Sequence, residues 1–305
     1  INEEFQFKLT ATLPANPDRA YDYYDEYMVT FCDTLSAGIT FDRWDTVVIN
    51  NGGADIPIPA ENYYSDASNQ DLTLSIEDAP GLNLNNGATI TVTYTAHLNE
   101  KAYVNTAGGG TDNKNSVYLE YSNNPRISTS LDHTTTSEVC VYTYQLNNTK
   151  HQDSENGPVL EGAGFRLYSN EACNAEDEIK LKMNDDGTYS RDFSTEGKGV
   201  EMLSNKDGQF NVKGLDAGTY YLKETNPPAG YSACPDKEIV ISATHDVYNV
   251  SLAGNLSNKI INKKAGGITL PSTGGIGTTI FYVVGGGLMV AAIVLLVTKK
   301  RMENK

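Results

Sequence analysis

Short runs of alternating apolar and polar residues make up most of this sequence, and they favour β-strands over helices. Successive side chains of a strand point to opposite faces, so a period of two marks a strand with one buried face. Clear examples are FQFKLTATL (5–13), YMVTFCDTL (27–35), ATITVTYTAHL (88–98), GTYYLKET (218–225) and KEIVISA (237–243). Turn residues separate the runs, and Asp-Gly pairs at 186–187 and 207–208 predict hairpin turns. Together these patterns predict an all-β fold of the sandwich type.

Composition divides the chain into two β-regions and a tail. The stretch RISTSLDHTTTSE (126–138) is rich in Ser and Thr and poor in apolar residues, so it is interpreted as a linker. A second β-region then opens with VCVYTYQL (139–146), which we expect to be one strand. The predicted domains are residues 1–137, 138–265 and 266–305.

The tail contains a run of 19 residues without a charge, IFYVVGGGLMVAAIVLLVT (280–298). At 1.5 Å per residue, a helix of this length crosses most of the ~30 Å hydrocarbon core of a bilayer. Basic residues follow at once, as is typical of cytoplasmic flanks. They are Lys299, Lys300, Arg301 and Lys305. The tail therefore predicts one transmembrane helix, with everything before it facing outward.

The sequence LPSTG (270–274) lies shortly before this apolar run. The order of motif, apolar span and basic end resembles the sorting signal of Gram-positive surface proteins. In that family a sortase attacks the carbonyl of the motif's threonine, releases the glycine side and passes the acyl group to an amine. The resemblance implies cleavage between Thr273 and Gly274, with the membrane serving only before sorting. The implied sortase motif is Leu270, Pro271, Ser272, Thr273 and Gly274. The alternative is an ordinary membrane anchor beside a chance LPxTG.

Charge and side-chain chemistry exclude several classes of function. The net charge is −16, from 39 acidic and 23 basic residues, which argues against a nucleic-acid partner. The four histidines are scattered, and no Ser or Cys has the sequence context of a hydrolase nucleophile. We therefore expect no enzyme, no cofactor and no metal site.

Four cysteines are too few and too scattered for a disulfide-built scaffold or a zinc site. Cys173 and Cys234 lie in loop-like stretches of the second region, so in an extracellular setting they form either a disulfide or two free thiols. No signal peptide opens the chain. Because a protein with this tail must be exported, we expect its natural N-terminus to lie upstream.

Both β-regions resemble known domains of surface proteins. FCDTLSAGITF (31–41), LNEKAYV (98–104) and NSVYLEYSNNP (115–125) resemble a repeated domain of sortase-assembled pilin shafts. PVLEGAGFRLY (158–168), GQFNVKGLDAGTYYLKETNPPAGY (208–231) and SNKIINKK (257–264) resemble the collagen-adhesin B-type domain, an inverted immunoglobulin-like sandwich. The resemblance implies tandem immunoglobulin-like β-sandwiches ahead of the sorting signal.

Strand parity places three polar residues of the second region on apolar faces. Glu224 shares a face with Tyr220 and Leu222, while Lys150 and Asn262 face inward from the first and last strands. An unpaired ionised carboxylate in a core would be very costly, so we expect Glu224 to stay protonated. A buried lysine becomes a competent amine, and a neutral carboxyl can polarise a carboxamide and pass a proton to departing ammonia.

Collagen-adhesin B-type domains perform this reaction once and spontaneously. A lysine of the first strand joins an asparagine of the last, promoted by the glutamate of a Y-x-L-x-E-T box. The resemblance therefore implies Lys150 and Asn262 as isopeptide partners and Glu224 as the promoting acid. Asn258 is an alternative to Asn262, and the plain alternative is a solvated Lys150 with a turn asparagine.

The first region offers two related candidates. Asp33 and Asn115 fall on apolar strand faces, whereas Lys8 lies opposite Phe5 and Phe7 and should face solvent. In similar domains the reactive lysine precedes a strand like 5–13. We therefore interpret Asp33 and Asn115 as the acid and the asparagine of a triad whose lysine lies upstream. An ordinary turn Asp and a strand-edge Asn are an equal alternative.

These resemblances imply a secreted, cell-wall-anchored structural subunit of a covalent pilus. Its partners would be a sortase and either cell-wall peptide or neighbouring pilin subunits, with a host-surface ligand as a further candidate. The Y-P-K-type lysine motif that accepts the next subunit in pilins is absent from this sequence. The alternatives are a monomeric adhesin in which the two domains form a stalk and, least favoured, a wall-anchored enzyme.

Overall fold

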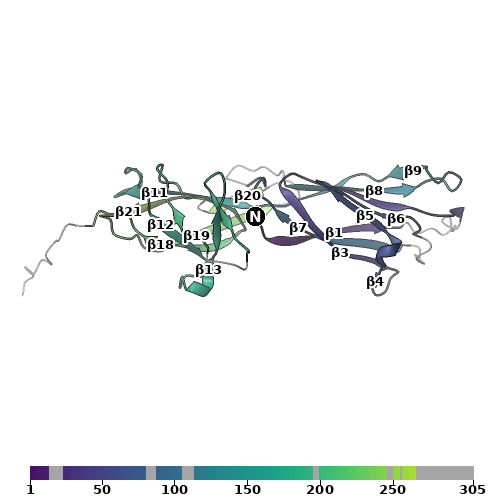
Figure 1. The fold of residues 1–305 in the computed structure, drawn as a ribbon, viewed down its shortest axis with the longest axis horizontal. Coiled ribbons are helices and arrows are strands. Elements are labelled where there is room, and N and C mark those ends of the chain that lie inside the picture. Colours follow the sequence, from purple (N-terminus) through teal and green to yellow (C-terminus); the bar gives the residue numbers. More distant parts are fainter. Residues whose placement is uncertain are drawn as a thin grey trace, which may run out of the picture. The chain divides into compact units, whose positions relative to one another are not determined.

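The computed structural model describes residues 1–13, 23–79, 87–104, 113–194, 199–245, 250–254 and 256–265. Within them, almost all regular structure is β-strand, arranged in four sheets that form two sandwiches (Figure 1). Residues 1–263 make up one compact unit, and a second unit covers residues 264–305. The predicted all-β fold is confirmed.

The first sandwich packs two antiparallel sheets face to face. One sheet contains, in spatial order, β1 (Glu4–Thr12), β7 (Thr89–Leu98), β3 (Ile39–Asn50) and β4 (Ile56–Pro57). The other contains β10 (Ser137–Cys140), β8 (Lys114–Ser122), β2 (Val29–Leu35), β6 (Asp71–Ile76) and β5 (Tyr64–Ser68), with β9 (Leu131–His133) paired to β8. The short 3-10 helix η2 (Ala60–Asn62) precedes β5. Buried apolar side chains of both sheets, among them Phe7, Phe31 and Ile90, form the core between them.

The second sandwich is built in the same way. One sheet contains β14 (Leu181–Met183), β15 (Tyr189–Arg191), β17 (Val212–Leu215), β11 (Tyr144–Gln152) and β21 (Ser257–Asn262). The other contains β13 (Glu178–Ile179), β12 (Gly164–Tyr168), β18 (Gly218–Asn226), β19 (Lys237–His245) and β20 (Val250–Gly254), with β16 (Met202–Leu203) paired to β12. A second 3-10 helix, η4 (Ala175–Asp177), leads into β13. Phe165, Phe210 and Leu222 belong to the core.

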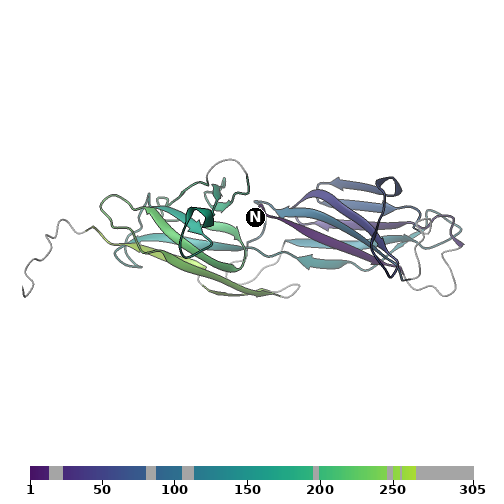
Figure 2. The same ribbon diagram turned by 90° about the horizontal axis from the view of Figure 1, so that it is seen from below.

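The first and last strands of the second sandwich lie side by side (Figure 2). β11 and β21 pair in parallel, with Lys150 opposite Ile260 and Gln152 opposite Asn262. Alternate residues of both strands are buried, as a period of two requires. This pairing brings residues more than 100 positions apart onto one small patch of the core.

Both Asp-Gly turns are present. Gly187 and Gly208 have φ angles of +78° and +73°, a backbone conformation that glycine adopts without steric cost. The first turn connects the antiparallel pair β14 and β15. In the second, Asn205 N–H donates to Gln209 O and Gly208 N–H donates to Asn205 O.

The expected linker and the strand after it were assigned incorrectly. The stretch 126–138 contains β9 and the start of β10, and both strands pair with β8. The strand expected over 139–146 is divided, because β10 ends at Cys140 in the first sandwich and β11 begins at Tyr144 in the second. Polar Ser and Thr residues suit exposed edge strands, where backbone pairing needs no apolar face. The domain limits given above remain predictions. The limit at 137/138 falls inside β10.

The membrane-spanning prediction concerns residues outside the described part of the chain. Among the residues that are described, no helix is both long and apolar enough to cross a bilayer. The expected span, 280–298, is not among them.

Candidate functional site

Lys150 lies in the middle of the second sandwich. It belongs to the buried face of β11, and its side chain has no solvent exposure. The Nζ atom lies 5.1 Å from the ring centroid of Phe165, and that ring stacks on Phe210 with centroids 4.2 Å apart. Aromatic rings therefore pack against one side of the amine. A buried amine needs polar partners on its other sides.

Those partners are Asn262 and Glu224. Lys150 Nζ donates to Asn262 Oδ1 at 2.5 Å, and it lies 3.2 Å from Glu224 Oε1. Asn262 Nδ2 donates to the same Oε1 at 2.8 Å. All three side chains are buried, and they come from β11, β21 and β18. Amine, carboxamide and carboxyl therefore form a closed triangle inside the core.

The second carboxyl oxygen of Glu224 has a separate partner. Cys234, in the connection between β18 and β19, donates its backbone N–H to Oε2 at 2.7 Å. Burial is the main cause that raises the pKa of the Cys234 thiol to about 11, so the thiol stays protonated at neutral pH. From the sequence, Cys234 was named only as a disulfide candidate and was not placed beside Glu224. A loop residue has no strand parity that predicts the direction of its side chain.

Asn258, the alternative to Asn262, has a different neighbour. Its Nδ2 donates to Asn148 Oδ1 at 3.2 Å, and Asn148 donates onward to Phe210 O. Asn258 pairs with Asn148, two residues before Lys150 on β11, although both asparagines of β21 face the core. The structure thus places Asn262, and not Asn258, against the lysine.

The triangle has the geometry of an acyl transfer. The amine of Lys150 lies against the carboxamide that it could attack. Glu224 Oε1 contacts both nitrogen atoms, so it can take a proton from the attacking amine and deliver one to the leaving ammonia. The aromatic wall and the complete burial keep competing water out of the reaction.

Asp33 and Asn115 meet in the core of the first sandwich, and Tyr94 joins them. The Tyr94 hydroxyl donates to Asp33 Oδ2 at 2.5 Å, while Asn115 Nδ2 donates to the Tyr94 oxygen at 2.6 Å. Asn115 Nδ2 also lies 3.4 Å from Asp33 Oδ2. Tyr94 was missed, although its parity with Ile90 and Val92 was visible in the sequence, because a tyrosine on an apolar face is usually ordinary core.

Burial dominates the electrostatics of this cluster. It raises the pKa of Asp33 from 3.8 to about 6, although Tyr94 and Asn115 oppose the shift by hydrogen bonding. Burial and the Asp33 charge raise the pKa of Tyr94, so the phenol stays a donor. Asp33 Oδ1 and Asn115 Oδ1 are buried without a hydrogen-bond partner among the described residues. Two buried acceptors of this cluster therefore have no donor among the described residues.

Lys8 is exposed on β1, as its parity predicted. Phe7, its neighbour on the buried face, packs its ring 5.3 Å from the ring of Tyr94. β1 therefore supplies an aromatic ring to the Asp33 cluster and no amine.

All four cysteines are free thiols. Of the two outcomes left open for Cys173 and Cys234, the structure has the unpaired one. Within the described ranges, no group of His, Cys, Asp and Glu side chains has the arrangement of a metal site.

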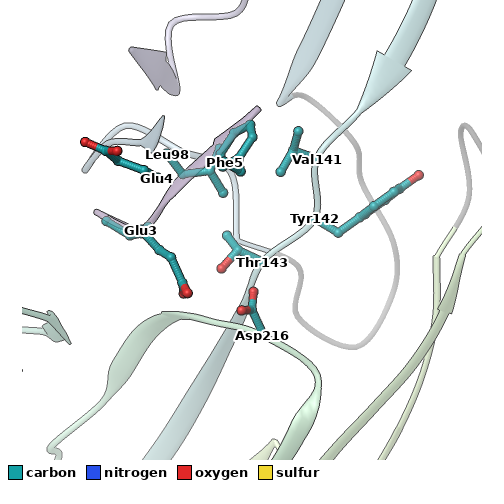
Figure 3. Close-up of a pocket in the computed structure, with 9 residues that line it drawn as sticks. Glu3, Glu4, Phe5, Leu98, Val141, Tyr142, Thr143 and Asp216 are labelled. Atoms are coloured by element: carbon teal, nitrogen blue, oxygen red, sulfur yellow. The ribbon is translucent and has the colours of Figure 1, made fainter. Parts of the chain in front are cut away.

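A pocket of about 300 Å³ lies where β1 and β7 approach the connection between β10 and β11 (Figure 3). Figure 3 shows Thr143 between Phe5 and Asp216, with Glu3 and Glu4 beside them. The side chains lining this pocket include carboxylates but no His, Cys or Lys. We assign it no function.

The predicted sortase motif lies outside the described residues. Leu270, Pro271, Ser272, Thr273 and Gly274 all fall in this part of the tail.

Family profiles match two parts of the sequence. Residues 145–255 match the SpaA prealbumin-like fold domain, and residues 262–304 match the LPXTG cell wall anchor motif. No curated protein matches the chain. The anchor motif makes this a secreted surface protein held in the cell wall, and the second sandwich has a prealbumin-like fold.

Solved structures with the same fold come from bacterial pili. The pilus 2b backbone protein of group B streptococcus aligns over 87% of this chain and 94% of its own, with a TM-score of 0.61 and 22% identity. A 35 kDa C-terminal fragment of a major pilin of Streptococcus agalactiae covers 86% and 93%, with a TM-score of 0.59 and 21% identity. Two domains of the major pilin SpaD from Corynebacterium diphtheriae cover 87% and 94%, with a TM-score of 0.55 and 21% identity. The fold of both sandwiches is thus shared with these proteins.

The buried carboxyl of Asp33 should make the stability of the first sandwich depend on pH. Its pKa is about 6 in the folded chain and near 3.8 when exposed, so the folded state holds the proton more tightly. The free energy of unfolding should fall by about 2 kcal/mol as the pH rises from about 4 to about 7. Asp33→Asn keeps the shape but removes the titration. In calorimetry, the melting temperature of Asp33→Asn minus that of wild type should therefore be larger at about pH 7 than at about pH 4.

Asp66→Asn is the matched control, because Asp66 lies exposed on β5 of the same sandwich. Its difference from wild type should not follow the same pH course. A constant difference between Asp33→Asn and wild type over this pH range would contradict the expectation.

Proposed function

We propose that this chain is a shaft subunit of a covalent pilus that a sortase assembles and anchors through Thr273. The observation that carries the proposal is the combination of two findings in one chain. A cell wall anchor motif follows two sandwiches whose arrangement is that of pilus backbone proteins over 87% of the sequence. The chain would then be a structural protein and the substrate of the enzyme that joins it to others.

The proposed attachment is an acyl transfer at the sorting motif. A sortase cysteine attacks the carbonyl carbon of Thr273, and the amine of Gly274 leaves with the rest of the tail. An amine of a neighbouring subunit or of cell-wall peptide then attacks the thioester and frees the cysteine. One peptide bond breaks and one amide forms, so no oxidant or cofactor is needed.

We propose a second covalent bond inside the second sandwich, between Lys150 and Asn262. The neutral amine attacks Cγ of Asn262, ammonia leaves, and the two side chains are joined by an amide. The support is the contact of both nitrogens with Glu224 Oε1, at 3.2 and 2.8 Å. Glu224 moves one proton from the attacking to the leaving nitrogen, so it ends as it began.

This bond would stabilise the sandwich by linking strands that are distant in sequence. Lys150 and Asn262 are 112 positions apart, and closing a loop of this size removes about 5 kcal/mol of chain entropy from the unfolded state on the disulfide scale. A subunit exposed to mechanical load would gain most, because an amide does not dissociate as hydrogen bonds do.

For the first sandwich we propose only that Asp33 and Asn115 are the acid and the asparagine of a related site. Their two partnerless oxygens could accept hydrogen bonds from an amine. Lys8 is not that amine, since it is exposed.

The internal bond predicts a mass deficit. Residues 1–265, with all cysteines reduced, should weigh about 17 Da less than their sequence mass, because ammonia leaves. Glu224→Ala should restore the full mass, and Glu224→Gln should form the bond slowly or not at all, since its amide cannot carry the proton. Lys150→Ala should restore the full mass and lower the melting temperature by more than about 10 °C. Intact-mass spectrometry and calorimetry measure these outcomes.

Glu238→Gln is the control, because Glu238 is exposed on β19 of the same sandwich. It should show the same deficit as wild type. A wild-type chain with the full sequence mass would mean that Lys150 and Asn262 stay separate.

Sorting predicts that the mature protein ends at Thr273. In cells that contain the sortase, residues 274–305 should be absent from wall-bound protein, as mass spectrometry of the C-terminal peptide can establish. Thr273→Ala should leave the tail attached and the protein in the membrane fraction. Full-length wild-type protein in that fraction would contradict the sorting assignment.

Assembly predicts a ladder of high-mass species when cell-wall extracts are boiled in detergent, since subunits joined by amides do not separate. The Lys150→Ala variant should still form the ladder, because its missing bond is internal to one subunit. A single monomer-sized band after wall digestion would favour the monomeric adhesin, in which the two sandwiches form a stalk.

A further inference from the structure

The connection between β18 and β19, residues 227–236, makes hydrogen bonds to or directly beside each of the three strands that carry Lys150, Glu224 and Asn262. The Tyr231 hydroxyl donates to Gln152 Oε1 at 2.8 Å, at the end of β11. Ser232 N–H donates to Lys263 O at 3.0 Å, directly after Asn262. Cys234 N–H donates to Glu224 Oε2 on β18. One short segment therefore contacts the strands that position the amine, the carboxamide and the carboxyl.

Cys234 goes further than the other two, because it contacts the reacting groups themselves. Its thiol lies close enough to Glu224 and Lys150 for both to act on the thiol pKa, which Glu224 raises and Lys150 lowers, and its backbone N–H donates to Oε2. A thiol is a small group that donates and accepts hydrogen bonds weakly. It can fill the space beside the amine without displacing Asn262 from Glu224.

We propose that Cys234 is a positioning residue for the cross-linking of Lys150 to Asn262. Its backbone N–H holds one oxygen of Glu224, and its thiol lies against that carboxyl and the lysine amine. The other oxygen, Oε1, is then left to serve both nitrogens of the reaction. This inference rests on the proposed internal bond.

The two carboxyl oxygens of Glu224 have different partners, and this difference is the reason for the assignment. Oε1 contacts Lys150 and Asn262, whereas the hydrogen bond that the described residues offer to Oε2 comes from Cys234. A carboxyl held by one oxygen cannot rotate about its terminal bond without losing that hydrogen bond. The oxygen that moves the proton thus stays between the two nitrogens, which is the alignment that proton transfer needs.

Two other roles for this cysteine fit the structure poorly. It does not pair with Cys173, since both are free thiols. Nor is it poised as a nucleophile, because its raised pKa keeps the sulfur protonated and a thiol attacks far more slowly than a thiolate.

The rate of cross-linking tests the proposal. Chains of residues 1–265 are recovered unfolded, diluted into reducing buffer, and followed by intact mass as ammonia is lost. Cys234→Ala removes the thiol contacts and should slow the reaction about tenfold, the upper end of the effect of one ordinary hydrogen bond. Cys234→Ser restores a small donor and acceptor, and its rate should return to within about threefold of wild type.

Cys173→Ala is the matched control. Cys173 belongs to the same sandwich, but the groups acting on its thiol are Asp236 and Lys223. This variant should react at the wild-type rate. To separate positioning from packing, Cys234→Ala is also compared with wild type in a Lys150→Ala chain, where no bond can form. The melting temperatures should then differ little.

Each outcome has a separate meaning. Cross-linking of Cys234→Ala at the wild-type rate would overturn the role of the Cys234 thiol and leave the bond in place. A Cys234→Ser variant as slow as Cys234→Ala would overturn it as well, because packing volume would then be the cause. Wild-type chains that never lose ammonia would overturn the internal bond, which is a failure of the proposed function.

Discussion

A lysine amine buried in a β-sandwich is the constraint on which the second half of this structure depends. An isolated ammonium inside a core is too costly to persist, so β11, β18 and β21 must bring polar groups to Lys150. Glu224 and Asn262 supply them at hydrogen-bonding distance. Even a paired buried charge gains little over an apolar core, because desolvation offsets the attraction. In the proposed reaction the lysine's part of that cost disappears, because an amide carries no charge.

The first sandwich meets a similar problem with different means. Asp33 is buried as deeply as Glu224, but its partners are the Tyr94 hydroxyl and the Asn115 amide. No cation among the described residues acts on this carboxyl, so burial raises its pKa and favours the protonated form. The two sandwiches thus differ in a testable way. In our proposal one forms a permanent covalent link, while the other keeps a carboxyl whose ionisation costs stability.

Strand parity explains how much of the site the sequence could predict. The period-two pattern correctly placed Lys150, Asn262, Glu224, Asp33 and Asn115 on buried faces, because alternation is a local property of the backbone. Parity gives a face but not a neighbour. The parallel pairing of β11 with β21 joins the two ends of a sandwich, and no local pattern encodes it. Cys234 lies in a loop, where parity does not apply, so its contact with Glu224 was not predicted. The edge strand β10 was not predicted either, because it begins in a Ser- and Thr-rich stretch without an apolar face.

The pairing of β11 with β21 also determines how this sandwich would carry tension. The chain enters at the start of β11 and leaves at the end of β21, and the two strands run parallel. Force applied along the chain therefore shears the ladder, so several hydrogen bonds share the load at once. A bond from Lys150 to Asn262 would shorten that path further. Load would pass along β11 to Lys150, across the amide, and out at Asn262, without stretching the residues between them. The position of the lysine near the far end of β11 is thus what allows one amide to shield nearly the whole sandwich.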